Sequence, residues 1–164
     1  MSLAQRWPEI RKIFQKANSY LVASISPDGF PHMTPIGTLW LREDVTGYYL
    51  ERFPRGLPLN LDHCDRVEVI ALDGSPGTWL RGLLKGRFPS LPAMRLRGHA
   101  GPRRPATEEE QERWQRKVRR LRFTKGHALL WSRMTHARDL RFEAYDPIRL
   151  GAMTEGLFPE PDGQ

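Results

Sequence analysis

The residues best suited to chemistry in this sequence are His32, Met33 and Thr34, which stand between Pro31 and Pro35. Proline has no backbone N–H, so a strand that contains two prolines cannot be paired along both of its edges. We therefore expect the three enclosed residues to face a ligand instead of a neighbouring strand. An imidazole titrates near neutral pH, which makes His32 the one attractive acid or base. A structural hydrogen bond explains His32 equally well, so no catalytic residue is assigned.

The common catalytic and metal-binding motifs do not occur in the sequence. The five histidines are scattered, and His63-Cys64-Asp65 has no second cluster at the spacing of metal ligands. Acidic neighbours disfavour a thiolate at Cys64. There is no Gly-x-Ser-x-Gly nucleophile elbow, no P-loop and no Gly-x-Gly-x-x-Gly motif. An enzyme made from this chain would therefore need a bound cofactor to carry the reaction.

The elements that would position these residues follow from hydrophobic periodicity and turn residues. Alternation of Tyr20, Val22 and Ser24 with their neighbours predicts a strand at 19–26. Pro27-Asp28-Gly29 then has the composition of a tight turn, in which proline presets φ and glycine accepts a positive φ. Further strands are predicted at 31–41, 48–52, 66–72, 93–102 and 139–146, with a continuation of the last at 148–153.

The clearest helix signal is Thr107 followed by Glu110, which is the pattern of a capping box. Glutamates near the start and arginines near the end suit the helix dipole, so we predict a helix at 107–122. Shorter helical segments are predicted at 8–17, 56–64 and 128–131. Residues 79–88 combine apolar residues at helical spacing with two glycines. We expect a short amphipathic helix or loop there that packs over the core as a lid. Its Arg and Lys residues leave a contact with a membrane surface or a phosphate as the alternative.

Composition indicates one soluble globular domain. The 164 residues are enough to bury a core, and we expect the domain to span 1–155, with a mobile tail at 156–164. No apolar run reaches the ~18 residues of a membrane span, and the N-terminus lacks the apolar core of a signal peptide. We therefore expect no membrane partner. A single cysteine cannot form an internal disulfide, so the cytoplasm is the simplest compartment.

The formal net charge of +7 has two explanations. A basic surface can bind nucleic acid or another anionic partner. A solvated surface with one local phosphate site accounts for the same charge with fewer assumptions. Nucleic acid is therefore kept as the second partner class, with the basic residues of the predicted helix 107–122 as the contact surface.

The predicted hairpin carries a family resemblance. Pro27-Asp28-Gly29-Phe30-Pro31-His32-Met33-Thr34-Pro35, between two strands, resembles the opening of the pyridoxamine 5'-phosphate oxidase-like family of FMN-binding split β-barrels. Residues 47–50, 60–70 and 94–100 resemble later elements of that family in the same order, and the likeness covers roughly residues 15–150. The resemblance implies a mainly β chain with flanking helices (α+β), folded as a split β-barrel.

The resemblance also implies a function and a site. Such proteins are homodimeric flavoproteins that hold FMN in a groove between subunits, and many are oxidoreductases, here on an unidentified small molecule. Their second strand runs along the flavin ring, and the phosphate is held where the third strand ends and the next helix begins. The matching residues in this sequence are His32, Met33, Thr34, Pro35 and Ile36 for the ring, and Glu51, Arg52, Arg55 and Asn60 for the phosphate.

The sequence departs from the family pattern at the phosphate segment. Glu51 stands where the family has Thr or Ser, and Gly56-Leu57 stands where it has a basic pair. Arg52 and Arg55 can replace that pair, because a guanidinium group binds phosphate as a fork. Glu51 would repel a phosphate unless an arginine intervenes.

Three alternatives to an FMN enzyme therefore stay open. The first is another cofactor, F420 or haem. The second is a cofactor-free basic module that binds nucleic acid. The third is a structural dimeric module of the same fold. Oxidation of pyridoxamine phosphate itself is not expected, because Ala137-Arg138-Asp139 matches the C-terminal motif of such enzymes only faintly.

Overall fold

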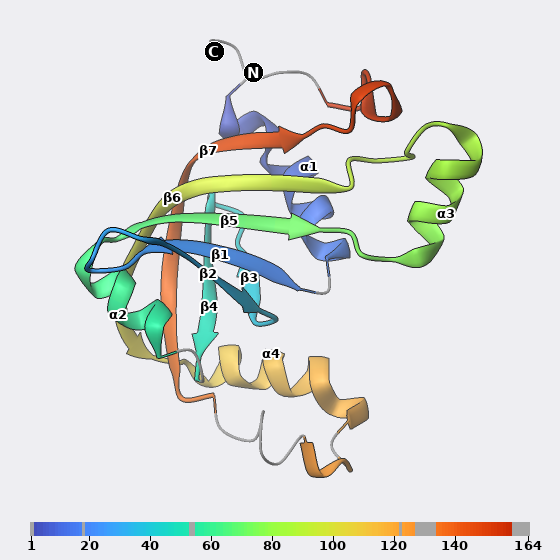
Figure 1. The fold of residues 1–164 in the computed structure, drawn as a ribbon. Helices are drawn as coiled ribbons and strands as arrows, with labels where there is room; N and C mark the ends of the chain where they lie inside the picture. The colour runs from blue at the N-terminus through green and yellow to red at the C-terminus, as the bar shows by residue number, and fades with distance from the viewer. Residues whose placement is uncertain (1, 18, 53–54, 122, 127–133, 159–164) are drawn as a thin grey trace.

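The computed structural model describes residues 2–17, 19–52, 55–121, 123–126 and 134–158 (Figure 1). Within these residues, seven strands form one antiparallel sheet in the order β2-β1-β5-β6-β7-β4-β3. The strands are β1 (Tyr20–Ile25), β2 (Pro31–Ile36), β3 (Leu39–Leu41), β4 (Thr46–Glu51), β5 (Arg66–Leu72), β6 (Ala93–Pro105) and β7 (His136–Ile148). The helices are α1 (Leu3–Lys16), α2 (Gly56–His63), α3 (Pro76–Lys85) and α4 (Glu108–Val118), with 3-10 turns at Arg119–Leu121 and Gly151–Thr154.

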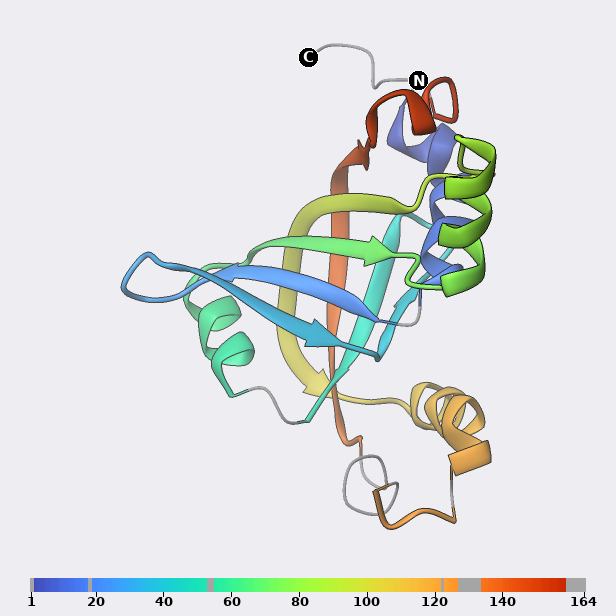
Figure 2. The same ribbon diagram turned by 45° about the vertical axis from the view of Figure 1, so that its right-hand side comes forward.

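The sheet curls until its two ends meet (Figure 2). β2 and β3 lie at opposite edges of the sheet although they follow one another in sequence. Just before β3, the pairing with β4 is continued by two hydrogen bonds: Leu50 N donates to Thr38 O over 3.3 Å, and Thr38 Oγ1 donates to Leu50 O over 2.9 Å. The fold is therefore a split β-barrel of the α+β class, as the sequence predicts.

Helix α1 fills one end of the barrel. Its residues Trp7, Ile10 and Phe14 recur at helical spacing and are buried in the main core together with inward-facing residues of β1, β5 and β7. Ser2 and Gln5 form a capping box that starts the helix at Leu3. The predicted start at Pro8 was therefore too late.

Helix α4 packs on the face of β4 that points away from the main core. Trp114 and Val118 join Tyr48 and Leu50 in a second apolar cluster, whereas Tyr49 between them belongs to the main core. The predicted capping box is present, with Thr107 accepting from Glu110 N and Glu110 accepting from Thr107 N. The α-helix ends at Val118 and continues as a 3-10 turn to Leu121.

Several predicted elements differ from the structure. The strand expected at 31–41 is two strands, because the chain leaves one edge of the sheet at Ile36 and joins the other at Leu39. The continuation at 148–153 is a 3-10 turn. Of the tail predicted at 156–164, Phe158 packs against the domain with its ring 5.8 Å from that of Tyr145, and 159–164 lie outside the described residues. The predicted turn at 128–131 lies outside the described residues.

The predicted lid is a helix, α3, but it does not cover the core. Leu80, Leu83 and Leu84 are all exposed, and Figure 1 shows α3 projecting beyond the ends of β5 and β6. None of the helices in the described parts of the chain is both long and apolar enough to cross a membrane.

Candidate functional site

A cavity of about 310 Å³ lies where the ends of β2 and β4 approach each other. Four of the nine residues predicted for a cofactor line it: Pro35 and Ile36 from β2, Glu51 from β4, and Arg52 just after β4. The remaining lining residues are Gly37, Thr38, Tyr49, Leu50, Trp114 and Met134. The cavity therefore joins two segments that the sequence analysis connected only through a family resemblance.

Strand β2 has the free edge that its prolines predict. In the described sheet it pairs with β1 and with no other strand. His32 and Met33 are exposed, whereas the side chain of Thr34 is buried with its Oγ1 3.4 Å from His32 Nδ1. The unpaired edge leaves backbone polar groups of β2 available to a ligand.

The start of α2 lies against β2. A Cβ atom placed on Gly56 would be 3.4 Å from His32 Cε1, so the imidazole rests on the first turn of the helix. Arg55 occupies the N-cap position of α2. Free amides at a helix start attract anions, and His32 and Arg55 flank that position with an imidazole and a guanidinium group.

Glu51 is buried and forms ion pairs with two arginines. Arg138 Nε lies 2.9 Å from Glu51 Oε1, and Arg103 Nε lies 3.1 Å from Oε2. The Tyr49 hydroxyl also donates to Glu51 Oε1 over 2.6 Å. Burial and the adjacent carboxylate raise the pKa of Tyr49, so its hydroxyl keeps its proton and remains a donor. The arginine that Glu51 needs in order not to repel a phosphate is therefore present.

The ion pairs around Glu51 balance in charge. Arg138 also pairs with Asp62 over 2.8 Å. Two carboxylates, Glu51 and Asp62, thus face two guanidinium groups, Arg103 and Arg138, which gives zero. The chain that follows Glu51 contributes two further guanidinium groups, Arg52 and Arg55.

Asn60, the ninth predicted residue, has a structural role in the described contacts. Its side chain is buried, and its Nδ2 donates to Ser24 Oγ over 3.0 Å. This bond ties α2 to β1 and so holds the helix start beside β2. Its contact with a cofactor stays a prediction.

The sequence analysis missed Arg103 and Arg138 as members of the site. Arg138 lies in the segment 137–139, which was noted only as a faint match to a family motif. Its contact with Glu51 depends on the pairing of β4 with β7, where Tyr49 is opposite Arg138. Residues this far apart give no local signal in a single sequence.

A larger, open hollow of about 640 Å³ lies on the exposed face of the sheet. Arg66, Arg97, Glu68 and Glu143 line it, so its charges are of both signs. None of the nine residues predicted for a cofactor lines this hollow. The cavity between β2 and β4 is smaller, but it is the better candidate for the cofactor site because four of those residues line it.

The basic residues of α4 are largely engaged within the chain. Arg113 pairs with Glu109, Arg116 pairs with Glu112, and Lys117 Nζ donates to Gly37 O over 3.1 Å. A surface prepared for nucleic acid would leave such cations available to backbone phosphates. The arrangement gives little support to the nucleic-acid hypothesis.

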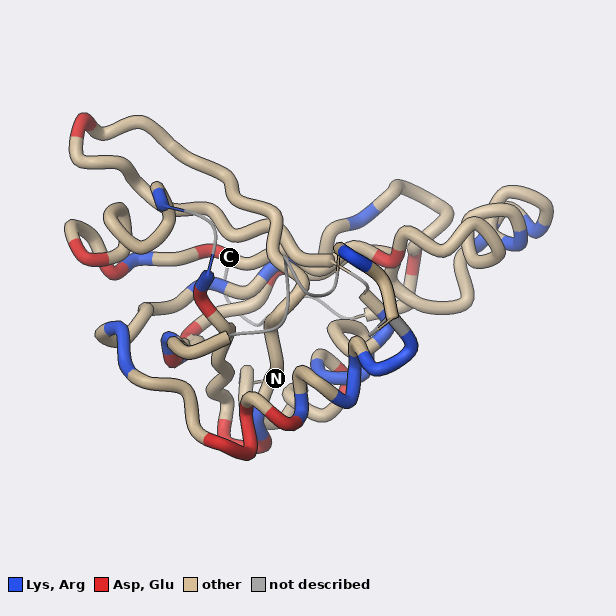
Figure 3. The backbone as a smooth tube through the Cα atoms, turned by 90° about the horizontal axis from the view of Figure 1, so that it is seen from below, with Lys and Arg blue, Asp and Glu red and all other residues tan. Residues whose placement is uncertain are grey.

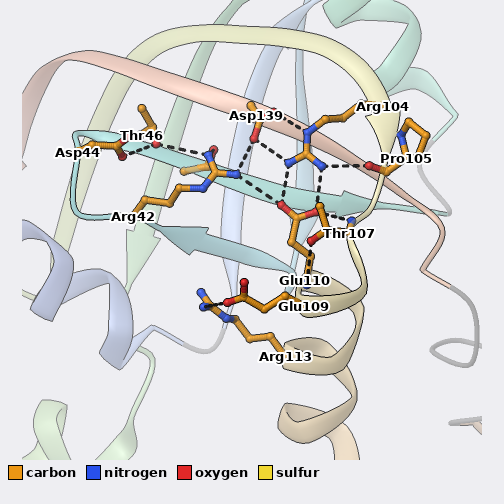
Figure 4. A network of polar contacts seen from close by, with 11 residues as sticks. Arg42, Asp44, Thr46, Arg104, Pro105, Thr107, Glu109, Glu110, Arg113 and Asp139 are labelled. Carbon is orange, nitrogen blue, oxygen red and sulfur yellow. Dashed lines mark hydrogen bonds and ion pairs between the residues drawn. The ribbon is translucent and has the colours of Figure 1, made fainter.

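A network of ion pairs holds the start of α4 against the sheet (Figure 4). Arg104 of β6 lies between Asp139 of β7 and Glu110 of the capping box, with contacts of 2.6 and 2.7 Å. Arg42 contacts the same two carboxylates. The network positions Trp114, one turn further along α4, at the wall of the candidate cavity.

Comparisons with known proteins identify the fold. No family model and no curated protein matches the sequence. Among solved structures, HupZ of Group A Streptococcus aligns with a TM-score of 0.60 at 16% identity, over 89% of this chain and 96% of that one. The chain has the fold of the pyridoxamine 5'-phosphate oxidase-like proteins. One of these, from Lactobacillus delbrueckii, aligns with a TM-score of 0.53 at 17% identity, over 84% and 90% of the two chains.

Two further solved structures are of proteins that are named after a cofactor. An FMN-binding protein from Syntrophomonas wolfei aligns with a TM-score of 0.56 at 15% identity, over 89% of this chain and 94% of that one. An F420 reductase aligns with a TM-score of 0.57 at 12% identity, over 83% and 94%. At such low sequence identity, the structural similarity establishes the shared fold alone.

Proposed function

We propose that this protein binds FMN and acts as an oxidoreductase on a small molecule. The observation that supports this most is the meeting of Pro35 and Ile36 with Glu51 and Arg52 around one cavity. Nearby in the chain, His32 lies against Gly56 at the start of α2. These are the segments that the family resemblance assigns to the flavin ring and to its phosphate. The FMN-binding protein of the same fold adds support.

The residues present fit the chemistry of FMN. The cavity offers apolar surface from Pro35, Ile36 and Trp114, which suits a planar aromatic ring. The phosphate would be held by Arg52, Arg55 and the amides at the start of α2. Glu51 does not oppose this, because Arg103 and Arg138 neutralise it.

Each part of the site then has a separate task. Bound FMN supplies electron and hydride transfer. Trp114 and Ile36 exclude water from one side of the cavity. The free edge of β2 orients a ligand through backbone groups, and the exposed imidazole of His32 offers a hydrogen-bonding group beside the helix start.

The partner we propose is a second copy of this chain. Phe30, at the tip of the β1–β2 hairpin, is 71% exposed, and Met33 of β2 is also exposed. Large apolar side chains exposed on one hairpin are typical of an interface. Replacement of both by serine should give a monomer in sedimentation velocity, whereas an unchanged dimer would place the interface elsewhere.

The deciding experiment is a flavin titration of the purified protein, followed by gel filtration and an absorption spectrum. The wild type should retain a flavin band, and Arg52→Ala combined with Arg55→Ala should lose it. Arg116→Ala combined with Arg119→Ala removes the same charge from α4 and the 3-10 turn that follows it, and serves as the matched control. Equal retention in all three proteins would refute the phosphate site.

The same titration with F420 and haem tests the alternative cofactors. The F420 reductase of the same fold favours F420 over haem as the second candidate. Retention of F420 without retention of FMN would replace FMN in the proposal and leave the arginine pair as the phosphate site.

A further inference from the structure

Helix α3 presents its apolar side to solvent. Leu80, Leu83 and Leu84 are 60%, 65% and 78% exposed, and Trp79 is partly exposed beside them. The described part of the chain packs nothing over these leucines, and Figure 3 shows the helix standing apart from the rest of the molecule. An exposed apolar group of this size on a soluble domain commonly marks an interaction surface.

The outward orientation of α3 is fixed by specific contacts. Gly82 faces the ring of Phe88 so closely that a Cβ atom there would lie 2.7 Å from Phe88 Cε1. Trp79 packs edge-on against the same ring, with centroids 5.2 Å apart, and its Nε1 donates to Asp73 O over 2.8 Å. At 3.6 residues per turn, Leu80 and Leu84 lie almost opposite Gly82.

The charge of this segment is entirely positive. Residues 74–107 contain no aspartate or glutamate. Arg81 and Lys85 are one turn apart on the flank of α3, and Arg87 follows the helix. All three are exposed, and none forms an ion pair within the described residues. Basic residues beside an outward apolar face are the arrangement by which short helices bind anionic lipid surfaces.

We propose that α3 docks the protein on an anionic membrane surface, with Leu80, Leu83 and Leu84 in the outer hydrocarbon layer and the basic residues at the headgroups. The long stems of Arg81 and Lys85 allow their charges to remain at the interface while the leucines insert. This proposal goes beyond flavin binding and replaces the sequence-based expectation that no membrane is involved.

Charge argues against a second copy as the occupant of this surface. In a two-fold symmetric contact the same surface meets itself. Arg81, Lys85 and Arg87 would then face their own counterparts, and like charges opposite one another oppose association. An anionic lipid layer complements both the apolar face of α3 and its positive charge.

The test is co-sedimentation of the whole protein with vesicles of phosphatidylcholine, alone or mixed with phosphatidylglycerol. The wild type should bind the mixed vesicles, bind neutral vesicles weakly, and lose binding as salt rises. Leu83→Ser combined with Leu84→Ser should weaken binding about tenfold or more because apolar insertion is lost. Leu59→Ser removes an equally exposed leucine from α2 and should have no effect.

Variants that remove positive charge measure how much electrostatic attraction contributes to vesicle binding. Arg81→Gln combined with Lys85→Gln should abolish the preference for phosphatidylglycerol. Arg116→Gln combined with Arg119→Gln, on α4 and the 3-10 turn after it, should preserve that preference. All replaced side chains are exposed, so circular dichroism should report unchanged folding.

Three results would overturn the proposal. These are no binding by the wild type, equal binding to both vesicle types, and undiminished binding by the serine variant. A wild-type oligomer that the serine variant loses, without any vesicle binding, would assign α3 to self-association. Retention of flavin is measured separately, so failure here leaves the proposed function intact.

Discussion

Arg138 Nε lies 2.9 Å from Glu51 Oε1, and the two side chains are only 1% and 2% exposed. Neighbouring strands β7 and β4 supply the pair, at the point where the candidate cavity opens. A buried pair contributes little net stability, but each charge becomes costly when its partner is removed. The pair also decides the chemistry of the site, because an unpaired Glu51 would repel a phosphate.

Removal of Arg138 alone should therefore strongly destabilise the fold. Arg138→Met leaves Glu51 without its inner partner and should lower the free energy of unfolding by about 3 to 5 kcal/mol. The double variant with Glu51→Gln removes both charges and should recover most of that loss. Urea unfolding at neutral pH measures both. A double variant as unstable as the single one would show that packing of Arg138, not charge pairing, matters.

Gly98 of β6 should tolerate no larger residue. A Cβ atom there would lie 2.0 Å from Arg141 O of β7, and that oxygen belongs to the backbone, which cannot rotate away. Gly98→Ala should cost about 3 kcal/mol or prevent folding. Gly101→Ala, in the same strand, meets no atom closer than 3.6 Å and should cost much less. Thermal unfolding of the two variants compares them directly.

The ion pairs around Arg104 predict loss of stability in acid. The Arg104 hydrogen bond, partly opposed by burial, lowers the pKa of Asp139 from its usual 3.8 to about 2. A carboxyl with a lowered folded-state pKa stabilises the protein above pH 4, and this contribution disappears as the pH falls toward 2. Because the side chain is 42% exposed, solvent screening reduces the contribution to about 1 kcal/mol.

Asp139→Asn isolates this contribution. The variant should be less stable than the wild type at pH 7, and the difference should shrink as the pH is lowered through 4 toward 2. Urea midpoints across that range give the difference at each pH. A constant difference would mean that the carboxylate charge has no part in the network.

A glycine at the cavity wall offers a test of the flavin proposal that spares the fold. A Cβ atom on Gly37 would meet no atom within 4 Å, so Gly37→Val should fold normally. The added isopropyl group narrows the cavity, and FMN retention should fall about tenfold. Gly74→Val places the same group in equally open surroundings away from the cavity. Equal flavin retention in both variants would place FMN elsewhere.

Local patterns in the sequence predicted most of the strands and helices. The turn Pro27-Asp28-Gly29, the prolines of β2 and the capping box of Thr107 each act within a few residues, so a single sequence reveals them. Gly29 has the positive φ of 87° that the turn requires. The capping box of Ser2 and Gln5 has the same kind of signal and was overlooked.

Long-range pairing could not be predicted in this way. The division of 31–41 into two strands depends on the chain crossing from one edge of the sheet to the other between Ile36 and Leu39, which no periodicity reveals. The pairing of Glu51 with Arg138 depends on the register of β4 and β7 for the same reason. The apolar spacing of α3 correctly indicated a helix, but spacing alone cannot say whether an apolar face points inward or outward.

The two hydrogen bonds between Thr38 and Leu50 join the short edge strand β3 to β4 at the wall of the cavity. Because β3 has only three residues and lies at the edge of the sheet, the Leu50 amide should exchange its hydrogen by local opening of this edge, at a lower free energy than global unfolding. A ligand that touches both β2 and β4 would oppose this opening. Slower exchange at Leu50, without change at buried amides of β5, would therefore report occupancy of the cavity by any ligand, coloured or not.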